Sequence, residues 1–202
     1  MNIAEKYLLL TLNTQGEFSI LDKSLKSIGL LASALGTLHR SGVIDLGSDH
    51  QIRLTGSPMV GLDPLRPLVQ FLQDNPMIKP EGLVYDYIVR LGNRFDELYH
   101  SVGMSLSNSQ MVRPKLRDSV LPKTLFIPER EKVDQLIWEM KWELGRHDMS
   151  PEIHDLWNIL KETQQLLVLS TGDVNKLLQQ LDQTQAGQLA RQMVVEYRTN
   201  IR

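Results

Sequence analysis

A long segment without charged side chains limits the possible folds of this chain more than any other feature. Between Ser27 and Leu38 no charged residue occurs. From Leu21 to Arg40 apolar residues recur at alternating steps of four and three, which predicts a helix, and further leucines and alanines occupy its opposite face. A helix that is apolar all round must be covered on every side. We therefore expect this segment to be the central helix of the fold.

The remaining sequence predicts further helices around this one and two small hairpins. Helical patterns occur over residues 3–12, 64–72, 80–91, 95–106, 128–144, 151–160, 174–181 and 189–197. Alternating residues around a glycine-containing turn predict a hairpin over 43–54. The segment 110–127 contains prolines and loses the helical period, which predicts a second hairpin. The expected fold class is mostly α: a single-domain helical bundle over residues 1–202, around a buried central helix, with two small β-hairpins, one of them protruding.

The composition excludes several classes of protein. The 202 residues include no cysteine, which removes disulfides, thiol nucleophiles and thiolate metal sites. The longest aliphatic run is Leu8 to Leu10, far shorter than a membrane-spanning helix needs, and Glu5 and Lys6 precede it, unlike a secretory signal. A net charge of −2 disfavours a protein devoted to nucleic acid. We therefore expect a cytoplasmic protein.

No sequence motif of the common enzyme classes occurs. A phosphate-binding loop, a dinucleotide fingerprint, a nucleophile elbow and a zinc-protease helix motif are all missing from the 202 residues. The five histidines fall on different expected elements and have no partner at a motif spacing. Glu139 and Glu143 are four residues apart on a helix, which is typical of a solvated face. We expect no catalytic residue, no metal site and no cofactor.

The expected second hairpin, over 110–127, combines two kinds of side chain. Cations alternate along its first arm and apolar residues dominate its second; they are Arg113, Lys115 and Arg117, followed by Val120, Leu121, Leu125 and Phe126. Apolar residues on a protruding ribbon need a cover, and three covers fit this pattern: a second copy of the chain, an anionic membrane, or the rest of the same domain. Self-association is the preferred interpretation, so aspartate at positions 120 and 121 is expected to produce a monomer.

A winged-helix regulator that binds DNA is the alternative interpretation. A helix, the central helix and the hairpin over 43–54 follow one another as in such a module, with the hairpin as wing. The helix that would enter the groove has Lys23, Lys26 and Arg40 but is aliphatic at its centre. A helix covered on all sides cannot lie in a DNA groove. The order of elements therefore suggests core architecture more than DNA recognition.

The order of motifs along the chain resembles the Golgi phosphoprotein 3 family. The resemblance starts with YLLLTL at 7–12 and the turn GEF at 16–18, and continues with LHRSGVIDL at 38–46 and GLDPL at 61–65. The helix over 80–91, the hairpin closed by Ile127-Pro128 and the helix over 149–166 follow in the family's order with similar spacing. The resemblance covers nearly the whole chain and rests on the ordered set, since no single motif is diagnostic.

This resemblance implies a non-enzymatic peripheral membrane protein with a helical fold. In the family, a protruding hairpin serves oligomerisation and membrane insertion, and eukaryotic members bind phosphatidylinositol 4-phosphate and connect the membrane to protein cargo. The expected partners are therefore anionic phospholipid, including phosphatidylinositol 4-phosphate, a second copy of the chain, and protein cargo. The chain has no long basic arm before its first helix, which suggests a trimmed or prokaryotic member.

The headgroup pocket of the family uses an aromatic residue and several arginines on two helices. The approximate counterparts here are Asp22 and Leu31 on the central helix, and Asp96 and Tyr99 on the helix before the second hairpin. An aspartate repels phosphate, so those positions do not carry the family's pocket over. The cations nearest to these positions are the candidate headgroup ligands: Lys23, Lys26 and Arg94.

Overall fold

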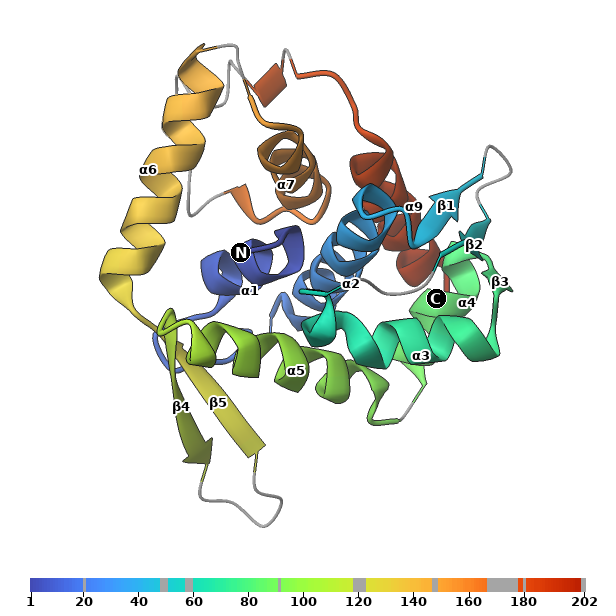
Figure 1. Ribbon diagram of the computed structural model, residues 1–202, viewed down its shortest axis with the longest axis horizontal. Coiled ribbons are helices and arrows are strands. Elements are labelled where there is room, and N and C mark those ends of the chain that lie inside the picture. The colour runs from blue at the N-terminus through green and yellow to red at the C-terminus, as the bar shows by residue number, and fades with distance from the viewer. Residues whose placement is uncertain are drawn as a thin grey trace.

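Helices account for most of the structure, which is a computed structural model (Figure 1). It describes residues 1–19, 21–47, 51–56, 60–90, 92–117, 123–146, 149–166, 178–179 and 181–200. The helices are α1 (Ile3–Thr11), α2 (Lys23–Arg40), α3 (Arg66–Asp74), α4 (Pro80–Val84), α5 (Arg94–Asn108), α6 (Arg130–Arg146), α7 (Pro151–Glu162) and α9 (Gln185–Asn200). The expected mostly α fold is confirmed.

The central helix is α2, as expected from the uncharged segment between Ser27 and Leu38. Every residue from Lys26 to Leu38 is buried, and α2 packs against α1, α7 and α9. The helix begins two residues later than expected, because Leu21 is fully exposed and Asp22 occupies the position before the first turn. The buried face of a helix this apolar supplies much of the core that holds the surrounding helices together.

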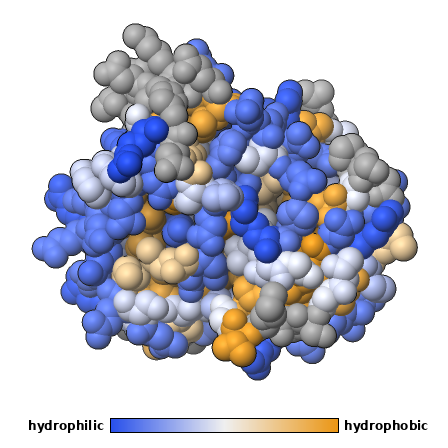
Figure 2. Space-filling view, turned by 45° about the horizontal axis from the view of Figure 1, so that its top comes forward, coloured by the Kyte–Doolittle hydropathy of each residue, from blue (hydrophilic) through white to orange (hydrophobic). Residues whose placement is uncertain are grey.

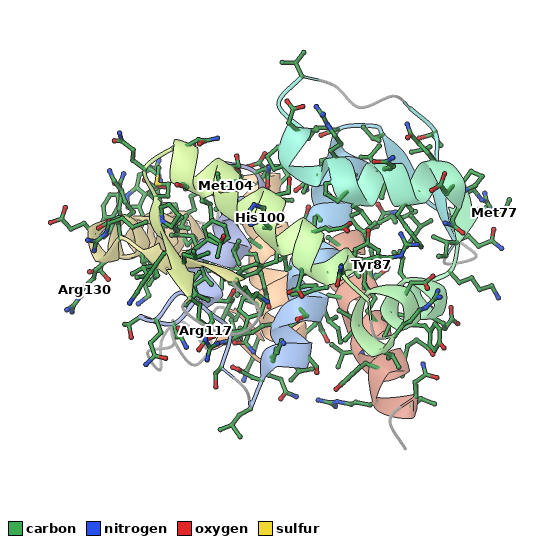
Figure 3. All side chains as sticks on the ribbon, turned by 90° about the horizontal axis from the view of Figure 1, so that it is seen from below. Met77, Tyr87, His100, Met104, Arg117 and Arg130 are labelled. Atoms are coloured by element: carbon green, nitrogen blue, oxygen red, sulfur yellow. The ribbon has the colours of Figure 1, made fainter. Side chains whose placement is uncertain are left out.

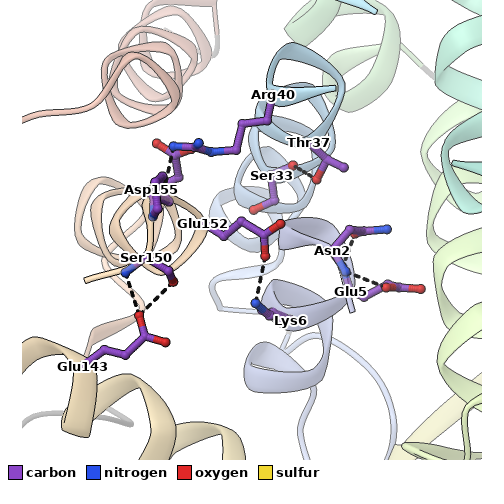
Figure 4. A network of polar contacts seen from close by, with 11 residues as sticks. Asn2, Glu5, Lys6, Ser33, Thr37, Arg40, Glu143, Ser150, Glu152 and Asp155 are labelled. Atoms are coloured by element: carbon purple, nitrogen blue, oxygen red, sulfur yellow. Dashed lines mark hydrogen bonds and ion pairs between the residues drawn. The ribbon is translucent and has the colours of Figure 1, made fainter. Parts of the chain in front are cut away.

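The other helices pack around α2. Figure 1 shows α5 along the lower side of the molecule, where it contacts α1 and α3, while α9 lies behind α2 and also contacts α4 and α7. Two ion pairs reinforce this arrangement: Arg40 at the end of α2 binds the buried Asp155 of α7, and Lys6 of α1 binds Glu152 of α7 at 3.0 Å (Figure 4). The helix expected over 174–181 lies almost wholly outside the described residues.

The first hairpin belongs to a three-stranded antiparallel sheet. Strands β1 (Ile44–Leu46) and β2 (Ile52–Leu54) form the expected hairpin, and β3 (Met77–Ile78) pairs with β2 in the order β1-β2-β3. The third strand was not predicted, because two residues are too few to show an alternating pattern. The pairing of β3 with β2 places the chain just before the start of α4 at Pro80.

The helix expected over 80–91 is interrupted. The α-helical turns of α4 end at Val84, and Tyr85–Val89 form a π-helical turn that closes with a hydrogen bond from the Arg90 backbone N–H to the Tyr85 carbonyl at 2.7 Å. A π-helical turn adds one residue relative to α-helical geometry and therefore rotates the following side chains. Arg90 follows this turn directly.

The second hairpin consists of β4 (Val112–Arg117) and β5 (Lys123–Pro128), which pair antiparallel from Val112 opposite Pro128 to Arg117 opposite Lys123. Figure 1 shows it extending from the lower edge of the molecule, beyond the end of α5. The protruding hairpin predicted from the prolines and the lost helical period is therefore present.

Of the three covers expected for the apolar residues of the hairpin, the rest of the same domain covers Leu125 and Phe126. Leu125 is buried, and Phe126 is fully buried with its ring 5.6 Å from that of Tyr99 on α5. Gly103 of α5 provides the space, since a Cβ there would lie 2.3 Å from two Phe126 ring atoms. The Phe126 backbone N–H also donates to the Gly16 carbonyl at 3.2 Å. The base of the hairpin is therefore packed against its own chain.

Two of the hairpin predictions concern its tip. Val120 and Leu121 lie outside the described residues, so their expected role stays a prediction. On the described part of the ribbon, Leu116 is the large apolar side chain that remains exposed, at 68%.

Candidate anion-binding site

A cavity of about 280 Å³ lies where the start of α2, the π-helical turn and the start of α5 meet. Lys23, Ser24 and Ser27 line it from the first turns of α2, Arg90 from the end of the π-helical turn, and Asp96 from α5. These three segments are far apart in the sequence. The cavity therefore exists only because the fold brings them together.

The start of α2 lacks a side-chain cap, although an acidic residue precedes it. Asp22 precedes the helix but its side chain caps none of the first backbone N–H groups. Its carboxylate instead binds the Lys26 ammonium at 3.2 Å. The unpaired N–H groups and the aligned peptide dipoles give the beginning of an 18-residue helix a partial positive charge. Such a terminus is a favourable place for a phosphate or carboxylate.

The side-chain charges around the cavity are mixed, and two of them are already compensated. Asp96 is bound by the Lys123 ammonium of β5 at 2.5 Å, and Arg90 lies 3.5 Å from Asp86 on the solvent side. Lys23 makes no ion pair within the described part of the chain. The described lining itself carries two cations, Lys23 and Arg90, and one carboxylate, Asp96. The charge of the lining is therefore positive by one unit.

Tyr87 also lines this cavity, with its ring 5.4 Å from that of Phe71. Burial raises the pKa of Tyr87 above the ordinary value, and the nearby Arg94 guanidinium opposes this only in part. The phenol therefore keeps its proton at neutral pH and can donate a hydrogen bond. At the other side, the Tyr197 hydroxyl of α9 donates to Ser24 Oγ at 2.8 Å and so braces the first turn of α2.

The structure does not bring the three headgroup candidates together in one cavity. Lys23 lines the cavity. Lys26 is buried, with only 10% of its side chain exposed, and is paired with Asp22 one turn earlier. The Arg94 guanidinium lies 4.8 Å above the Phe71 ring, in a separate open groove between α3 and α5. Only Lys23 therefore keeps its predicted role as a candidate ligand.

Arg90 is the cation that the sequence interpretation missed. Arg90 directly follows the π-helical turn in an extended backbone conformation and lines the cavity, although 63% of its side chain is exposed. No signal in the sequence marks this turn. The aromatic residues Phe95 and Phe18, whose ring centroids are 6.2 Å apart, close the neighbouring part of the core.

The hairpin cations are exposed, but two of the three have acidic partners. Arg113 binds Glu129 at 2.6 Å and Arg117 binds Glu17 at 3.1 Å, each with more than half of the arginine side chain exposed. Lys115 is exposed and has no ion-pair partner among the described residues. Figure 3, which looks at the molecule from below, shows Arg117 and Tyr87 from the same side.

Another depression on the surface lacks the charged lining of this cavity. This depression lies between the β1–β2 end and α9 and is lined by glutamine side chains such as Gln185 and Gln192. On the face in Figure 2, hydrophobic residues are scattered among hydrophilic ones. Within the described ranges, no cluster of three metal-ligating side chains occurs, and no helix has the length and apolar character needed to span a bilayer.

No protein-family model matches this sequence, and none of the curated proteins matches it significantly. The resemblance to the Golgi phosphoprotein 3 family therefore stays a prediction, and the functional argument rests on the geometry of the cavity and the hairpin.

Proposed function

We propose that this chain is a non-enzymatic peripheral membrane protein that holds a phosphate-bearing lipid headgroup in the cavity at the start of α2. In this proposal it acts as an adaptor between the membrane and other proteins. The observation that carries the proposal is the coincidence of an uncapped helix terminus with Lys23 and Arg90 in one cavity of about 280 Å³. The helix terminus and the two cations both favour a negatively charged ligand.

The chemistry of a phosphate fits the donors that the cavity offers. A phosphate monoester has three acceptor oxygens and close to two negative charges. Lys23, Arg90 and the first turn of α2 all line the cavity, and they carry an ammonium, a guanidinium and backbone N–H donors. A phosphorylated inositol headgroup would use several of them at once, whereas a headgroup with one diester phosphate would use fewer. We therefore propose a phosphoinositide such as phosphatidylinositol 4-phosphate as the preferred ligand.

The hairpin supports the membrane part of this proposal. It extends beyond the end of α5, and its described outer half carries Lys115, Arg117 and the exposed Leu116. Cations near an anionic bilayer surface contribute on the order of 1 kcal/mol each. An exposed leucine beside them can enter the headgroup region. Self-association through the hairpin is part of the same proposal and depends on this outer half, since its base is buried.

The alternative of a winged-helix regulator has less support. Its reading helix would be α2, whose residues from Lys26 to Leu38 are covered by other helices. A helix in that position has no free face for the major groove. A salt-dependent shift of random duplex DNA at low ionic strength would be needed to favour the regulator.

Liposome co-sedimentation tests the proposed function. Vesicles of phosphatidylcholine alone, with phosphatidylserine, and with phosphatidylinositol 4-phosphate at equal total charge are compared. We expect the strongest pelleting with the phosphoinositide. Lys23→Glu and Arg90→Glu should each weaken that binding on the order of tenfold or more, since each loses a charge-assisted hydrogen bond.

Arg66→Glu is the matched control, because Arg66 is an exposed arginine of α3 outside this cavity, with 75% of its side chain accessible. It should leave phosphoinositide binding nearly unchanged. Equal pelleting with all three vesicles, or equal losses for Arg66→Glu and Arg90→Glu, would show that the cavity does not select the headgroup. Absence of pelleting with every vesicle would remove the proposal.

A further inference from the structure

Asp96 is the carboxylate in the described lining of the cavity at the start of α2, and it lies there beside the cations Lys23 and Arg90. A carboxylate repels phosphate, so a site for phosphate alone gains nothing from this residue. A carboxylate does accept hydrogen bonds from hydroxyl groups. A ligand that uses the whole lining therefore carries a phosphate for the cations and a hydrogen-bond donor for Asp96.

Lys123, the first residue of β5, holds the Asp96 side chain in place. The Lys123 ammonium donates to Asp96 Oδ1 at 2.5 Å and lies 5.4 Å from the centroid of the Tyr99 ring, one turn further along α5. Tyr99 is itself fixed, because its hydroxyl donates to the Gly16 carbonyl at 2.8 Å. A residue of the hairpin therefore orients the Asp96 carboxylate and balances its charge.

The cavity still offers polar groups for a ligand that has hydroxyls. Asp96 Oδ2 accepts no hydrogen bond from the residues that the structure describes. Ser24 and Ser27 line the same cavity from α2. Ser24 Oγ accepts from the Tyr197 hydroxyl at 2.8 Å and can donate its own proton to a ligand. The lining thus combines a hydroxyl acceptor and a hydroxyl donor with two cations.

We infer that Asp96 is a specificity-determining residue that accepts hydrogen bonds from the hydroxyls of a phosphorylated polyol, and that Lys123 is the residue that positions it. The role of Asp96 rests on the phosphate site proposed above. The phosphate lies near Lys23 and Arg90, and hydroxyls next to it lie at Asp96. A cavity of about 280 Å³ is at the small end of ligand sites, which fits a single ring with one phosphate.

A hydroxyl fits Asp96 better than the ammonium group of a phosphorylated amine does. Lys123 already places a positive charge against this carboxylate, so a ligand ammonium at Asp96 Oδ2 would be repelled by Lys123. A neutral hydroxyl meets no such repulsion and forms a charge-assisted hydrogen bond with the carboxylate. The preferred ligand therefore carries several hydroxyls beside its phosphate, as inositol phosphate does, either in a lipid headgroup or as a free ester.

Isothermal titration calorimetry of the full chain at neutral pH tests the role of Asp96. The probes are inorganic phosphate, phosphoethanolamine and inositol monophosphate. The wild type should bind inositol monophosphate about tenfold more tightly than either of the others. In Asp96→Ala the ratio of the affinities for inositol monophosphate and inorganic phosphate should fall by about tenfold, because the hydroxyl acceptor is lost. Inorganic phosphate should bind at least as tightly as in the wild type, since a repelling charge is removed. A distorted cavity would instead bind both ligands more weakly.

Lys123→Ala should lower the same affinity ratio, because Asp96 loses the contact that orients it, and Lys123→Arg should restore the ratio. Loss of a positive charge alone would weaken both ligands by the same factor and leave the ratio unchanged. Asp86→Ala is the matched control, since Asp86 lies 3.5 Å from Arg90 but does not line the cavity. This control also removes a negative charge and should keep the wild-type ratio.

Vesicles containing phosphatidylinositol 4-phosphate distinguish a lipid headgroup from a free ester. If the wild type pellets with them but Asp96→Ala keeps the wild-type affinity ratio, the role of Asp96 is refuted and the proposed function stands. If the soluble ligands give the expected ratios but no vesicle pellets the protein, the ligand is a free ester, and the proposed membrane function fails while the role of Asp96 stands. Equal affinity of the wild type for all three soluble probes, or binding of none, refutes the role of Asp96.

Discussion

Gly103→Ala is expected to destabilise the protein, although alanine favours helices more than glycine does. Gly103 lies within α5, and a Cβ at this position would be 2.3 Å from two atoms of the Phe126 ring and 2.6 Å from a third. The ring cannot move freely, because the rings of Tyr99 and His100 lie 5.6 and 5.8 Å from it. The added methyl group must therefore displace β5 from α5.

The magnitude follows from two opposing effects. Replacing glycine by alanine inside a helix stabilises it by about 1 kcal/mol. Overpacking a filled core typically costs about 1–3 kcal/mol, and a contact more than 1 Å too short, against an aromatic ring held on several sides, belongs at the upper end. We therefore expect Gly103→Ala to lower the free energy of unfolding by about 1–2 kcal/mol. For a chain of this length, that corresponds to a melting temperature lower by about 2–8 °C.

Urea unfolding followed by circular dichroism measures this effect. Gly145→Ala is the matched control, since Gly145 also lies in a helix but a Cβ there meets no atom within 4 Å. The control should be neutral or more stable by up to about 1 kcal/mol. Adding Phe126→Leu to Gly103→Ala should cost less than Phe126→Leu alone costs in the wild type. If Gly103→Ala is as stable as Gly145→Ala, the close packing of the hairpin on α5 is refuted.

Two further predictions concern titration and buried charge. Burial raises the pKa of the Tyr7 phenol in the folded protein. Above about pH 10 the unfolded chain loses this proton while the folded protein keeps it. The free energy of unfolding therefore falls by about 1.4 kcal/mol per pH unit in that range. Urea midpoints measured between neutral and alkaline pH should therefore decline less steeply in Tyr7→Phe, and an unchanged slope would contradict this assignment. Arg40→Ala leaves the buried Asp155 carboxylate without its partner and should cost about 1–3 kcal/mol in the same assay. Arg66→Ala breaks only an exposed ion pair with Asp63 and should lower the free energy of unfolding by less than about 1 kcal/mol. Equal losses of stability in Arg40→Ala and Arg66→Ala would show that burial of Asp155 does not strengthen its ion pair.

The helical elements could be predicted because their signals are local. Ser27 to Leu38 lacks charge on every face, and the helix there is buried as expected. The start of α7 at Pro151 follows the expected signal of a serine and a proline. These signals depend on residues within one or two helical turns of each other. They can therefore be recognised from the sequence without knowledge of tertiary contacts.

The hairpin shows where local signals were insufficient. Its strands were predicted from lost helical periodicity, but the direction of Phe126 depends on Gly103, which lies on a different element and leaves the space for the ring. A second copy was therefore preferred as the cover of the apolar residues of β5, although α5 of the same chain covers Phe126. The tryptophans of α6 are the reverse case, since Trp138 is a large apolar residue that remains outside.

The sequence alone determined that this chain forms helices around one uncharged central helix, because hydrophobic period and charge placement act over a few residues. Only the tertiary structure decided which cations share a cavity. Lys23, Lys26 and Arg94 are close to the expected positions, yet an ion pair sequesters Lys26 and an aromatic ring holds Arg94 elsewhere. Arg90, which follows the π-helical turn, lines the cavity instead. Whether charged side chains from distant segments meet in one cavity depends on the directions in which they point. Tertiary packing sets these directions.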